Sequence, residues 1–444
     1  MQIKLSDHFT YKKLLRFTLP SIVMMIFTSI YGVVDGFFVS NFVGKTPFAA
    51  VNFIMPFIMI LGAFGFMFGT GGSALVAKTM GEGDSEKANR IFSLIVYTSL
   101  ITGVLIAILG VLFIRPVASL LGAEGEMLEN CVRYGRIVLL ATPAFMMQFE
   151  FQSFFVAAEK PKLGLMSTVA AGVTNMVMDA LLVALLDLGL EGAAMATALS
   201  QCVGGAIPLI YFSRKNTSRL KLGKTNYDGR ALAKTCVNGS SELMANISMS
   251  LVRMLYNIQL LAYAGENGVA AYGVLMYVNF VFISAFIGYS VGAAPIVGYN
   301  FGAGNKTELR GLLKKSLTLI GCFSVSMVIA AELLATPFAT LFVGYDQELM
   351  EMTVKGFVIS AFAFLFSGIA IYGSSFFTAL NDGLTSAAIS FMRTLIFQVA
   401  AVLLFPIIWG VDGIWISIVA AELMAAATTL LFLVLKRKRY GYFG

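Results

Sequence analysis

The chain has 444 residues, of which 58% are hydrophobic and only 12% are charged, and its mean hydropathy is +0.84. A soluble domain has about 45–50% apolar and about 25% charged residues, so this composition excludes an ordinary soluble protein. The four cysteines are scattered and there is one histidine. Zinc sites, thiol catalysis and histidine acid–base chemistry therefore have no visible basis, and we predict an integral membrane protein that is not an enzyme.

Apolar runs of about 20 residues, long enough to cross a bilayer as a helix, occur twelve times along the chain. The first six spans are expected at 14–39, 48–77, 91–113, 134–157, 163–186 and 192–212. The second six are expected at 235–262, 269–299, 316–336, 355–380, 384–408 and 413–435. The polar start runs directly into a span too long for the apolar region of a signal peptide, so we expect no cleavage. The predicted fold class is an all-α polytopic membrane protein with twelve transmembrane helices.

The distribution of basic residues predicts the orientation. Of the 31 Lys and Arg residues, 24 lie in the N-terminal segment, the even-numbered loops and the C-terminal segment, and five lie on the opposite side. By the positive-inside rule, we expect both termini in the cytoplasm and the protein in the plasma membrane.

The two halves of the chain repeat one unit. "MGEGDSEK" at 80–87 aligns with "FGAGNKTE" at 301–308, a spacing of 221 residues. Each copy has an even number of spans, so both copies have the same orientation and are related by an axis along the membrane normal. We predict two pseudo-symmetric six-helix lobes, 1–212 and 235–444, joined by a basic cytoplasmic linker, 213–234. A central cleft between two such lobes is a transporter plan.

Polar residues inside the first-lobe spans are the candidate site. An Asp at the centre of a lone membrane helix costs roughly 2.5–3.5 kcal/mol, so such residues usually face other helices or a cavity. Asp35, Asp179 and Thr197 each lie about six or seven residues from the outer end of a span, roughly 9–11 Å deep at 1.5 Å per residue. Asn175 lies one turn deeper than Asp179 on the same face. We therefore expect these four side chains to meet.

Two carboxylates close together in a low-dielectric site cannot both stay ionised without a counter-charge. The first-lobe spans contain no Lys or Arg at that depth. The missing charge is therefore either a proton or a small cation, and carboxylate, amide and hydroxyl oxygens suit a hard cation such as Na⁺. The alternative is that these groups only hydrogen-bond between helices. Apart from this coupling ion, no cofactor is expected.

The second lobe departs from this pattern. At the 221-residue spacing, the counterparts of Asp35 and Asp179 are Tyr256 and Ala400, so we expect no matching cation site there. One face of the seventh span carries instead Glu242, Asn246, Met249 and Arg253.

Glu242 and Arg253 form either a second ionisable site that faces the cleft or a structural pair. Arg393 and Glu422, in spans 11 and 12, are expected to pair structurally. For Glu150 in span 4 both roles stay open.

Four stretches of the chain resemble the multidrug and toxic compound extrusion (MATE) family, in its bacterial multidrug branch. They are "LPSIVMMIFTSIYGVVDGFFVSNFVG" at 19–44, the loops "GEGDSEKANR" and "GAGNKTELRG", and "AAEKPKLGLMSTVAAGVTNMVMD" at 157–179. The resemblance covers nearly the whole chain. It implies a MATE-type fold and a secondary antiporter that exports lipophilic, often cationic compounds in exchange for Na⁺ or H⁺ by alternating access.

The resemblance also implies roles for single residues. The cation site would be Asp35, Asn175, Asp179 and Thr197, with the backbone carbonyl of Ala193 as a further ligand, Tyr134 in the surrounding network and Glu242 at an acidic position that other branches use for coupling. Pro20 is either a point where the first span bends with the cation state or a helix-start proline. The expected partners are small-molecule drugs, the coupling cation and membrane lipids, without nucleic acid, and the protein is expected to be a monomer.

Three rival functions would each require sequence features other than those of a drug antiporter. A lipid-linked oligosaccharide flippase of the same superfamily would be expected to line its cleft with several cations, whereas the spans hold only Arg253 and Arg393. A major facilitator carrier favours a D-[RK]-x-G-[RK] run that "GEGDSEKANR" lacks. A membrane enzyme needs a polar constellation at the interface, and none stands out in the sequence. The chain has no Walker motif, so ATP is not the expected energy source.

Overall fold

The computed structural model describes residues 3–38, 42–43, 45–344 and 346–442. Within these residues all regular secondary structure is helical, which confirms the predicted fold class. The helices of the first half are α1 (Tyr11–Phe38), α2 (Lys45–Gly81), α3 (Ser85–Leu120), α4 (Gly125–Leu140), α5 (Thr142–Ala157), α6 (Pro161–Met178), the π-helix η2 (Asp179–Leu185) and α7 (Gly189–Ser213). Those of the second half are α8 (Gly229–Gly302), α9 (Lys306–Val343), α10 (Gln347–Ala361), α11 (Phe364–Ala379), α12 (Gly383–Phe391), the π-helix η3 (Met392–Ile396) and α13 (Phe397–Tyr440).

Two glycines divide the longest helices into separate spans. The helix α8 breaks at Gly265, where φ is 64°, and α13 breaks at Gly410, where φ is 57°. A positive φ is easily adopted only by glycine. Length and apolar composition alone select eight spans in the described residues, or nine if the bent pair α10–α11 is one span. Twelve result when α4–α5 and the first part of α8 are added and the α12–α13 segment is divided at Gly410.

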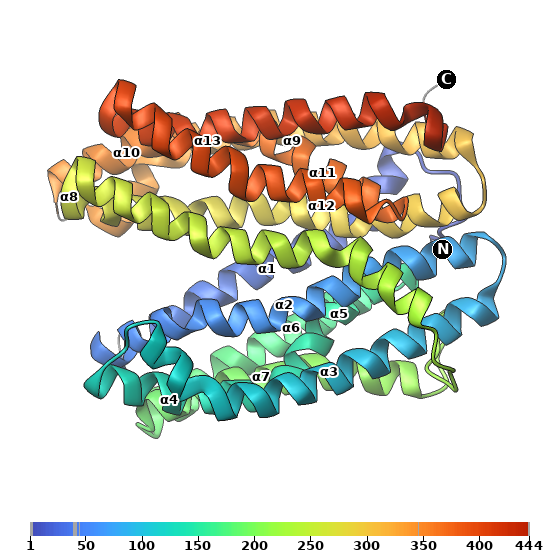
Figure 1. Cartoon of the computed structure of the whole chain (residues 1–444), viewed down its shortest axis with the longest axis horizontal. Coiled ribbons are helices and arrows are strands. Elements are labelled where there is room, and N and C mark those ends of the chain that lie inside the picture. Colours follow the sequence, from blue (N-terminus) through green and yellow to red (C-terminus); the bar gives the residue numbers. More distant parts are fainter. Residues whose placement is uncertain (1–2, 39–41, 44, 345, 443–444) are drawn as a thin grey trace.

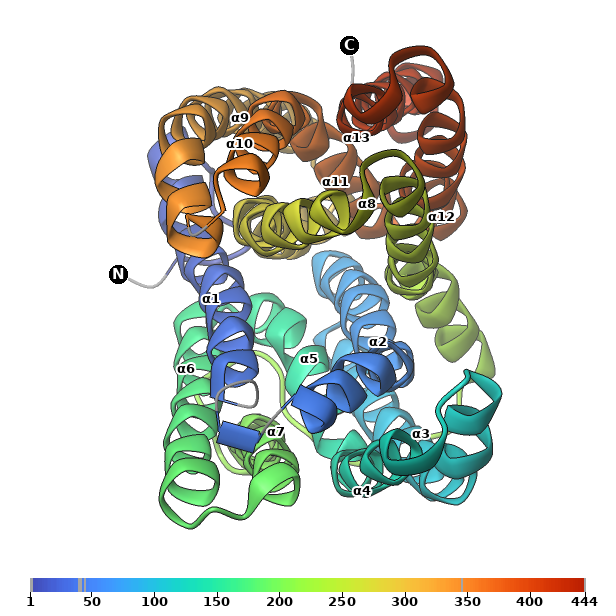
Figure 2. The same cartoon turned by 90° about the vertical axis from the view of Figure 1, so that its left-hand side faces the viewer.

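The two halves of the chain form two groups of helices. Figure 2 shows α1–α7 gathered on one side and α9–α13 on the other, with α8 facing α2 between them. Both termini lie at one end of the molecule, together with the linker between α7 and α8 (Figure 1). We call this end the terminal side and the opposite end the far side. The two groups lie close together at the terminal side and diverge toward the far side (Figure 1).

Glycines let the backbones of α2 and α8 touch at the terminal side. A Cβ added to Gly302 would lie 1.9 Å from the carbonyl oxygen of Lys78, and one added to Gly81 would lie 2.0 Å from that of Tyr299. These two contacts are related by the same 221-residue spacing that relates the halves of the sequence. The repeat therefore builds a two-fold contact at this crossing.

A second crossing of α2 and α8 lies deeper in the molecule. A Cβ on Gly71 would lie 2.0 Å from the carbonyl oxygen of Thr235, and one on Gly239 would lie 1.9 Å from that of Met67. No side chain fits between backbones at such distances. The two halves are therefore closed against each other at the terminal side.

The N-terminal segment adds contacts to both halves at the same end. The backbone N–H of Leu5 donates to Oε1 of Glu159 in the first half at 2.8 Å. The backbone N–H of Phe9 donates to Oε1 of Glu308 in the second half at 2.9 Å. Leu5 and Phe9 are fully buried, so this segment ties the two groups together.

Candidate functional site

Close packing of α1 against α6 positions the first two site residues. A Cβ added to Gly172 on α6 would lie 2.5 Å from Cε1 of Phe27 and 3.1 Å from Cδ1 of Tyr31 on α1. Asp35 lies one turn beyond Tyr31, and Asn175 nearly one turn beyond Gly172. The side-chain amide of Asn175 donates to Oδ1 of Asp35 at 3.4 Å.

Five elements, α1, α4, α6, η2 and α7, bring the predicted site residues together. The carboxyl group of Asp35 interacts with the side chains of Asn175, Asp179 and Thr197. The hydroxyl of Tyr134 on α4 interacts with Thr197 and electrostatically with both carboxyl groups. The sequence placed Asp35, Asp179 and Thr197 at one depth on three spans, with Asn175 one turn deeper, and these four side chains lie together in the structure; their role in binding a cation stays a prediction.

The site is an array of buried oxygens that lie close to one another but mostly outside hydrogen-bonding geometry. Asp179 and Tyr134 are fully buried, and Asn175 is 2% exposed. Among the described residues, five of the site's oxygens have no hydrogen-bond partner: Asn175 Oδ1, both carboxyl oxygens of Asp179, Thr197 Oγ1 and the Tyr134 hydroxyl. Leaving a buried polar group unpaired costs roughly 1–3 kcal/mol. A small cation in their midst would satisfy several of these oxygens at once.

No basic side chain neutralises the site from within. In the part of the chain that the structure describes, none of the salt bridges involves Asp35 or Asp179. The two carboxyl groups interact with each other instead. Among the described residues, no basic side chain therefore supplies a positive counter-charge to this pair.

The helix that carries Asp179 widens at that residue. Asp179 is the first residue of η2, a seven-residue π-helix that follows α6. Single π turns in helices are frequent at functional sites. The segment "DALLVAL" contains neither glycine nor proline, so the sequence did not indicate this widening.

Two further predicted residues lie nearby. Ala193 is fully buried on α7, one turn before Thr197; the ligand role of its carbonyl stays a prediction. Pro20 lies inside α1 and not at its start, so the helix-start interpretation is wrong. A proline in a helix interior removes one backbone hydrogen bond; bending of α1 at Pro20 with the cation state stays a prediction.

The sequence analysis missed polar residues that extend the site toward the terminal side. Tyr31 interacts with Asp35 and with the side chain of Gln148 on α5. Gln201 lies one turn beyond Thr197 on α7, and its Oε1 is buried without a hydrogen-bond partner in the described residues. The four-residue spacings from Asp35 and Thr197 would have indicated both Tyr31 and Gln201.

The corresponding place in the second half holds an uncharged network. The hydroxyl of Tyr256, the counterpart of Asp35, hydrogen-bonds to Oε1 of Gln398 at 2.8 Å and to Oγ of Ser417 at 2.9 Å. Its ring stacks on that of Tyr272 with 5.2 Å between the centroids. Tyr256 is 1% exposed, so a satisfied aromatic side chain fills this position.

Of the two charged pairs considered for the second half, the structure contains Arg393–Glu422 but not Glu242–Arg253. Nε of Arg393 donates to both carboxylate oxygens of Glu422, at 3.1 and 2.9 Å, which confirms that predicted pair. Glu242 interacts electrostatically with Arg393, whereas Arg253 interacts with the Tyr272 hydroxyl. In the described residues Glu242 and Arg253 form no salt bridge with each other, so their direct pairing is wrong. The two residues point to different partners because they are three helical turns apart.

Glu150 is the remaining acidic residue inside a span. It is fully buried, interacts with Ser99 on α3, and neither carboxyl oxygen has a hydrogen-bond partner within the described residues. It does not belong to the Asp35 site.

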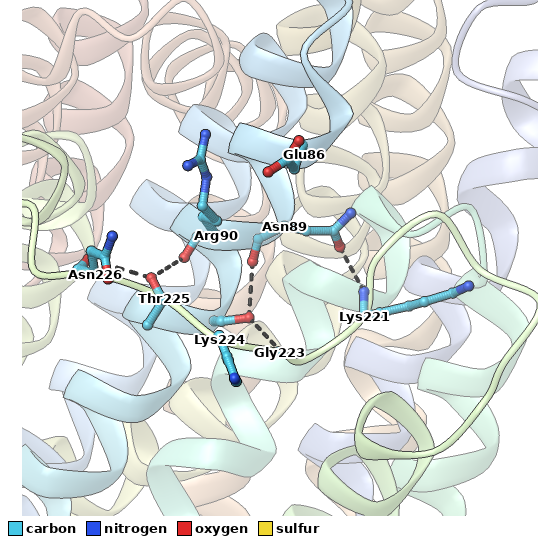
Figure 3. A pocket seen from close by; sticks show the side chains of 9 residues that line it. Glu86, Asn89, Arg90, Lys221, Gly223, Lys224, Thr225 and Asn226 are labelled. Atoms are coloured by element: carbon cyan, nitrogen blue, oxygen red, sulfur yellow. Dashed lines mark hydrogen bonds between the residues drawn. The ribbon is translucent and has the colours of Figure 1, made fainter.

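A pocket at the terminal side lies between α3 and the linker. Backbone N–H groups of Lys221 and Gly223 donate to Asn89 Oδ1 at 2.7 Å and to Ser93 Oγ at 3.0 Å, which holds the linker on α3. In Figure 3 the side chains of Arg90, Lys221 and Lys224 point in different directions. These three side chains therefore do not converge on one point as an anion site would require.

Comparison with known proteins relates this arrangement to a family. The family model for MatE matches residues 20–181 and, a second time, residues 243–404. The chain belongs to the MatE family. The two matches also show the internal repeat, one copy in each half, and the Asp35 site lies within the first copy.

Curated relatives of this MatE protein are multidrug exporters. It is 28% identical over 437 residues to the multidrug export protein MepA of Staphylococcus haemolyticus, which covers 97% of this chain and 94% of that protein. It is 24% identical over 433 residues to MepA of Staphylococcus aureus strain MSSA476, with the same coverage of both chains. Membership of a multidrug efflux transporter family is thus shown.

Solved structures share the fold. An outward-facing conformation of a multidrug resistance MATE family transporter superposes with a TM-score of 0.93 at 22% identity and covers 98% of both chains. MATE in the straight conformation gives a TM-score of 0.92 at 23% identity and covers 99% of this chain and 98% of that one. MATE in the bent conformation gives 0.90 at 23% identity and covers 98% and 97%. At these identities the likeness concerns the fold alone.

Proposed function

We propose that this MatE protein is a secondary active multidrug antiporter that exports lipophilic, often cationic compounds in exchange for Na⁺ or H⁺ by alternating access. The observation that carries the proposal is the group of buried, unpaired oxygens around Asp35 and Asp179 in a site without an internal counter-charge. Such a site is costly unless a cation occupies it during the cycle. The energy of the site therefore depends on whether a cation is bound, and this dependence would couple ion binding to the conformation of the protein.

The ends of the molecule support an alternating mechanism. The α2–α8 glycine contacts close the terminal side, and the two groups of helices diverge toward the far side. With the terminal side in the cytoplasm of the plasma membrane, this is the outward-open arrangement. The ion enters from outside, neutralises the two carboxyl groups and lowers the affinity for the drug, which then leaves. Inward opening separates the glycine contacts and releases the ion to the cytoplasm.

The donor set favours Na⁺ as the first candidate ion. A proton on Asp179 would give one hydroxyl, which donates to one acceptor. A Na⁺ ion accepts several oxygen ligands at once, as other hard cations do, and the site offers unpaired oxygens from four side chains. The complete burial of Asp179 favours a proton as the second candidate, because burial disfavours the charged form.

Either ion would carry enough energy for export. One elementary charge that crosses a membrane potential is worth roughly 2.3 kcal/mol per 100 mV. An imposed ion gradient adds about 1.4 kcal/mol for each factor of ten. Together these correspond to an accumulation ratio of about two orders of magnitude or more for an exported neutral compound.

Transport into proteoliposomes tests the proposal. Purified protein is reconstituted, and ethidium movement is followed by fluorescence while a Na⁺ gradient at equal pH or a pH gradient without Na⁺ is imposed. We expect ethidium to move against its own gradient when one of these ions runs down its gradient in the opposite direction, and we expect Na⁺ to be the more effective ion. ATP alone should have no effect.

Each arm of this assay has a defined reading. Response to the pH gradient only would assign the coupling to H⁺ and keep the antiport mechanism. Ethidium movement that ignores both gradients would exclude antiport. Protein-free liposomes under the same gradients give the background.

A lipid-linked oligosaccharide flippase remains the alternative, and the charges disfavour it. Such an anionic substrate needs unpaired cations along its path. Arg393 is already paired with Glu422 and interacts with Glu242, which leaves Arg253 of the two basic residues that the sequence places inside spans. We propose further that the protein acts as a monomer among membrane lipids and needs no cofactor beyond its coupling ion.

A further inference from the structure

A segment before α1 lies across both halves at the terminal side. We call this segment, residues 3–10, the strap. Its residues Leu5 and Phe9 are fully buried, whereas Ser6 and His8 between them are exposed. A chain terminus is usually loosely held unless specific contacts tie it down. Two buried anchors four residues apart show that the strap is fixed in place in this conformation.

Several of the strap's hydrogen bonds are with the second half. The backbone N–H of Phe9 donates to Oε1 of Glu308 on α9 at 2.9 Å, and the carbonyl oxygen of Phe9 accepts from the ammonium of Lys315 on the same helix. The carbonyl oxygen of Leu5 accepts from Nδ2 of Asn300 on α8 at 3.4 Å. Glu308 is only 7% exposed, so its bond to Phe9 is shielded from water.

The beginning of α1 packs on the same half. A Cβ added to Gly292 on α8 would lie 3.0 Å from Cα of Thr18, and one added to Gly288 would lie 2.6 Å from Cα of Ile22. Backbones this close leave no room for a side chain between them. The strap and the beginning of α1 therefore form one packed unit with the second half.

Glu159 connects the strap to the first half. It lies in the turn between α5 and α6, is 5% exposed, and its Oε1 accepts the backbone N–H of Leu5 at 2.8 Å. Nε of Arg219 in the linker lies 3.4 Å from the same oxygen. The Arg219 guanidinium also lies over the ring of Tyr299 on α8, 5.8 Å from the ring centroid. Hydrogen bonds to a carboxylate are stronger than those to a neutral oxygen, so Glu159 is a strong point of attachment.

The strap is too short to follow the two halves far apart. Leu5 and Phe9 are four residues apart, and a fully extended chain spans at most about 3.3–3.6 Å per residue, or about 14 Å here. Inward opening separates the halves at this end, so one of the strap's two ends has to be released. The second half holds the strap through several hydrogen bonds, and the Leu5–Glu159 bond is therefore the one expected to break.

We propose that the strap is a latch on the closed terminal side: Glu159 holds it in the outward-open state and releases it when the protein opens inward. This inference rests on the alternating access of the proposed function and adds a control that lies outside the Asp35 site. A bond that is present in only one of two states shifts the balance between them, whereas a bond present in both shifts nothing. Glu159 should therefore set how often the protein opens inward, although it does not belong to the cation site.

Cysteine labelling of the purified full chain in nanodiscs tests the latch without any ion gradient. In a variant without the four native cysteines, Thr235→Cys places a thiol at the second α2–α8 crossing, where Thr235 is fully buried in the closed conformation. A water-soluble maleimide reaches this thiol only when the terminal side opens. We expect Glu159→Ala to raise the labelling rate about tenfold. Glu159→Gln, which keeps the shape of the side chain and a neutral acceptor, should raise it about three- to fivefold.

Two matched variants distinguish the latch from its neighbours. Glu308→Ala removes the corresponding hydrogen bond at the end of the strap that stays attached, so the labelling rate should remain within about twofold of the wild type. Arg219→Gln removes the linker's contact with Glu159 but leaves the Leu5 bond, and it should likewise stay within about twofold.

Three results would each overturn the proposal. Wild-type labelling rates in the Glu159 variants would show that the strap does not hold the terminal side closed. Equal acceleration by Glu308→Ala would show that the strap is not released at Glu159. The full effect in Arg219→Gln would assign the latch to the linker. Thermal unfolding and size-exclusion profiles show whether each variant is folded, and the conservative Glu159→Gln carries the test if Glu159→Ala is not.

Failure of the latch can be told apart from failure of the proposed function. Labelling is measured at equilibrium, whereas coupling is measured by imposed gradients. Faster labelling of Glu159→Ala without any gradient response of the wild type would refute antiport and keep the latch. Gradient-driven export with unchanged labelling would keep antiport and remove the latch.

Discussion

Replacement of Asp179 by Asn is expected to leave the protein folded and inserted but to reduce ethidium efflux to the level of cells without the transporter. The amide has the same shape but cannot supply the negative charge that attracts the coupling cation. Asp179 is fully buried and lies against Asp35, so its charge acts in a low-dielectric site where it is strong. Asp35→Asn is expected to have the same effect. Efflux from whole cells, normalised to the amount of protein in the membrane, is the measurement.

Asp187→Asn is the matched control for this experiment. Asp187 is exposed in the connection between η2 and α7, and its positive φ of 49° is one that Asn also tolerates. Asp187→Asn should therefore export ethidium at the wild-type rate. Normal extrusion by a well-expressed Asp179→Asn variant would contradict the ion-coupling scheme.

Replacement of Gly302 by Val is also expected to abolish transport, but for a different reason: the terminal side can no longer close. Any Cβ at this position would lie 1.9 Å from the carbonyl oxygen of Lys78. Overpacking of such a contact costs typically 1–3 kcal/mol, and each 1.4 kcal/mol shifts a conformational equilibrium about tenfold. The protein should then favour the state in which the two halves are separated at this end. Gly81→Val, at the symmetry-related position, should act in the same way.

Cysteine labelling measures this shift directly. In a variant without the four native cysteines, Thr235→Cys places a thiol at the second α2–α8 crossing, where Thr235 is fully buried. A membrane-impermeant maleimide applied at the terminal side should label it about tenfold faster after Gly302→Val. Gly321→Val on α9 is the control, since a Cβ there meets no atom within 4 Å. Unchanged labelling and normal efflux in Gly302→Val would show that this crossing does not gate the pathway.

The sequence by itself determined the membrane fold and most of the Asp35 site. Lipid offers no hydrogen bonds to the backbone, so spans must be helices, and their length is set by the bilayer. A charged residue inside such a span is expensive, so Asp35 and Asp179 stood out individually. Their equal distances from the span ends then predicted that they meet, because depth along a helix can be counted at a fixed rise per residue. The 221-residue spacing of the repeat likewise required only the chain itself, and the two MatE matches also place one copy in each half.

Only the tertiary structure decided which side chains face each other around the helix axes. Periodicity gives the face of a helix but not the element that packs on it. The sequence therefore offered Arg253, on the same helix, as one possible partner of Glu242, whereas Glu242 interacts electrostatically with Arg393 from η3. The widened turn at Asp179 has no glycine or proline to mark it, whereas the helix breaks fall at Gly265 and Gly410, among many glycines that do not break a helix. These long-range contacts depend on how two groups of helices close on each other, and that is a property of the assembled fold.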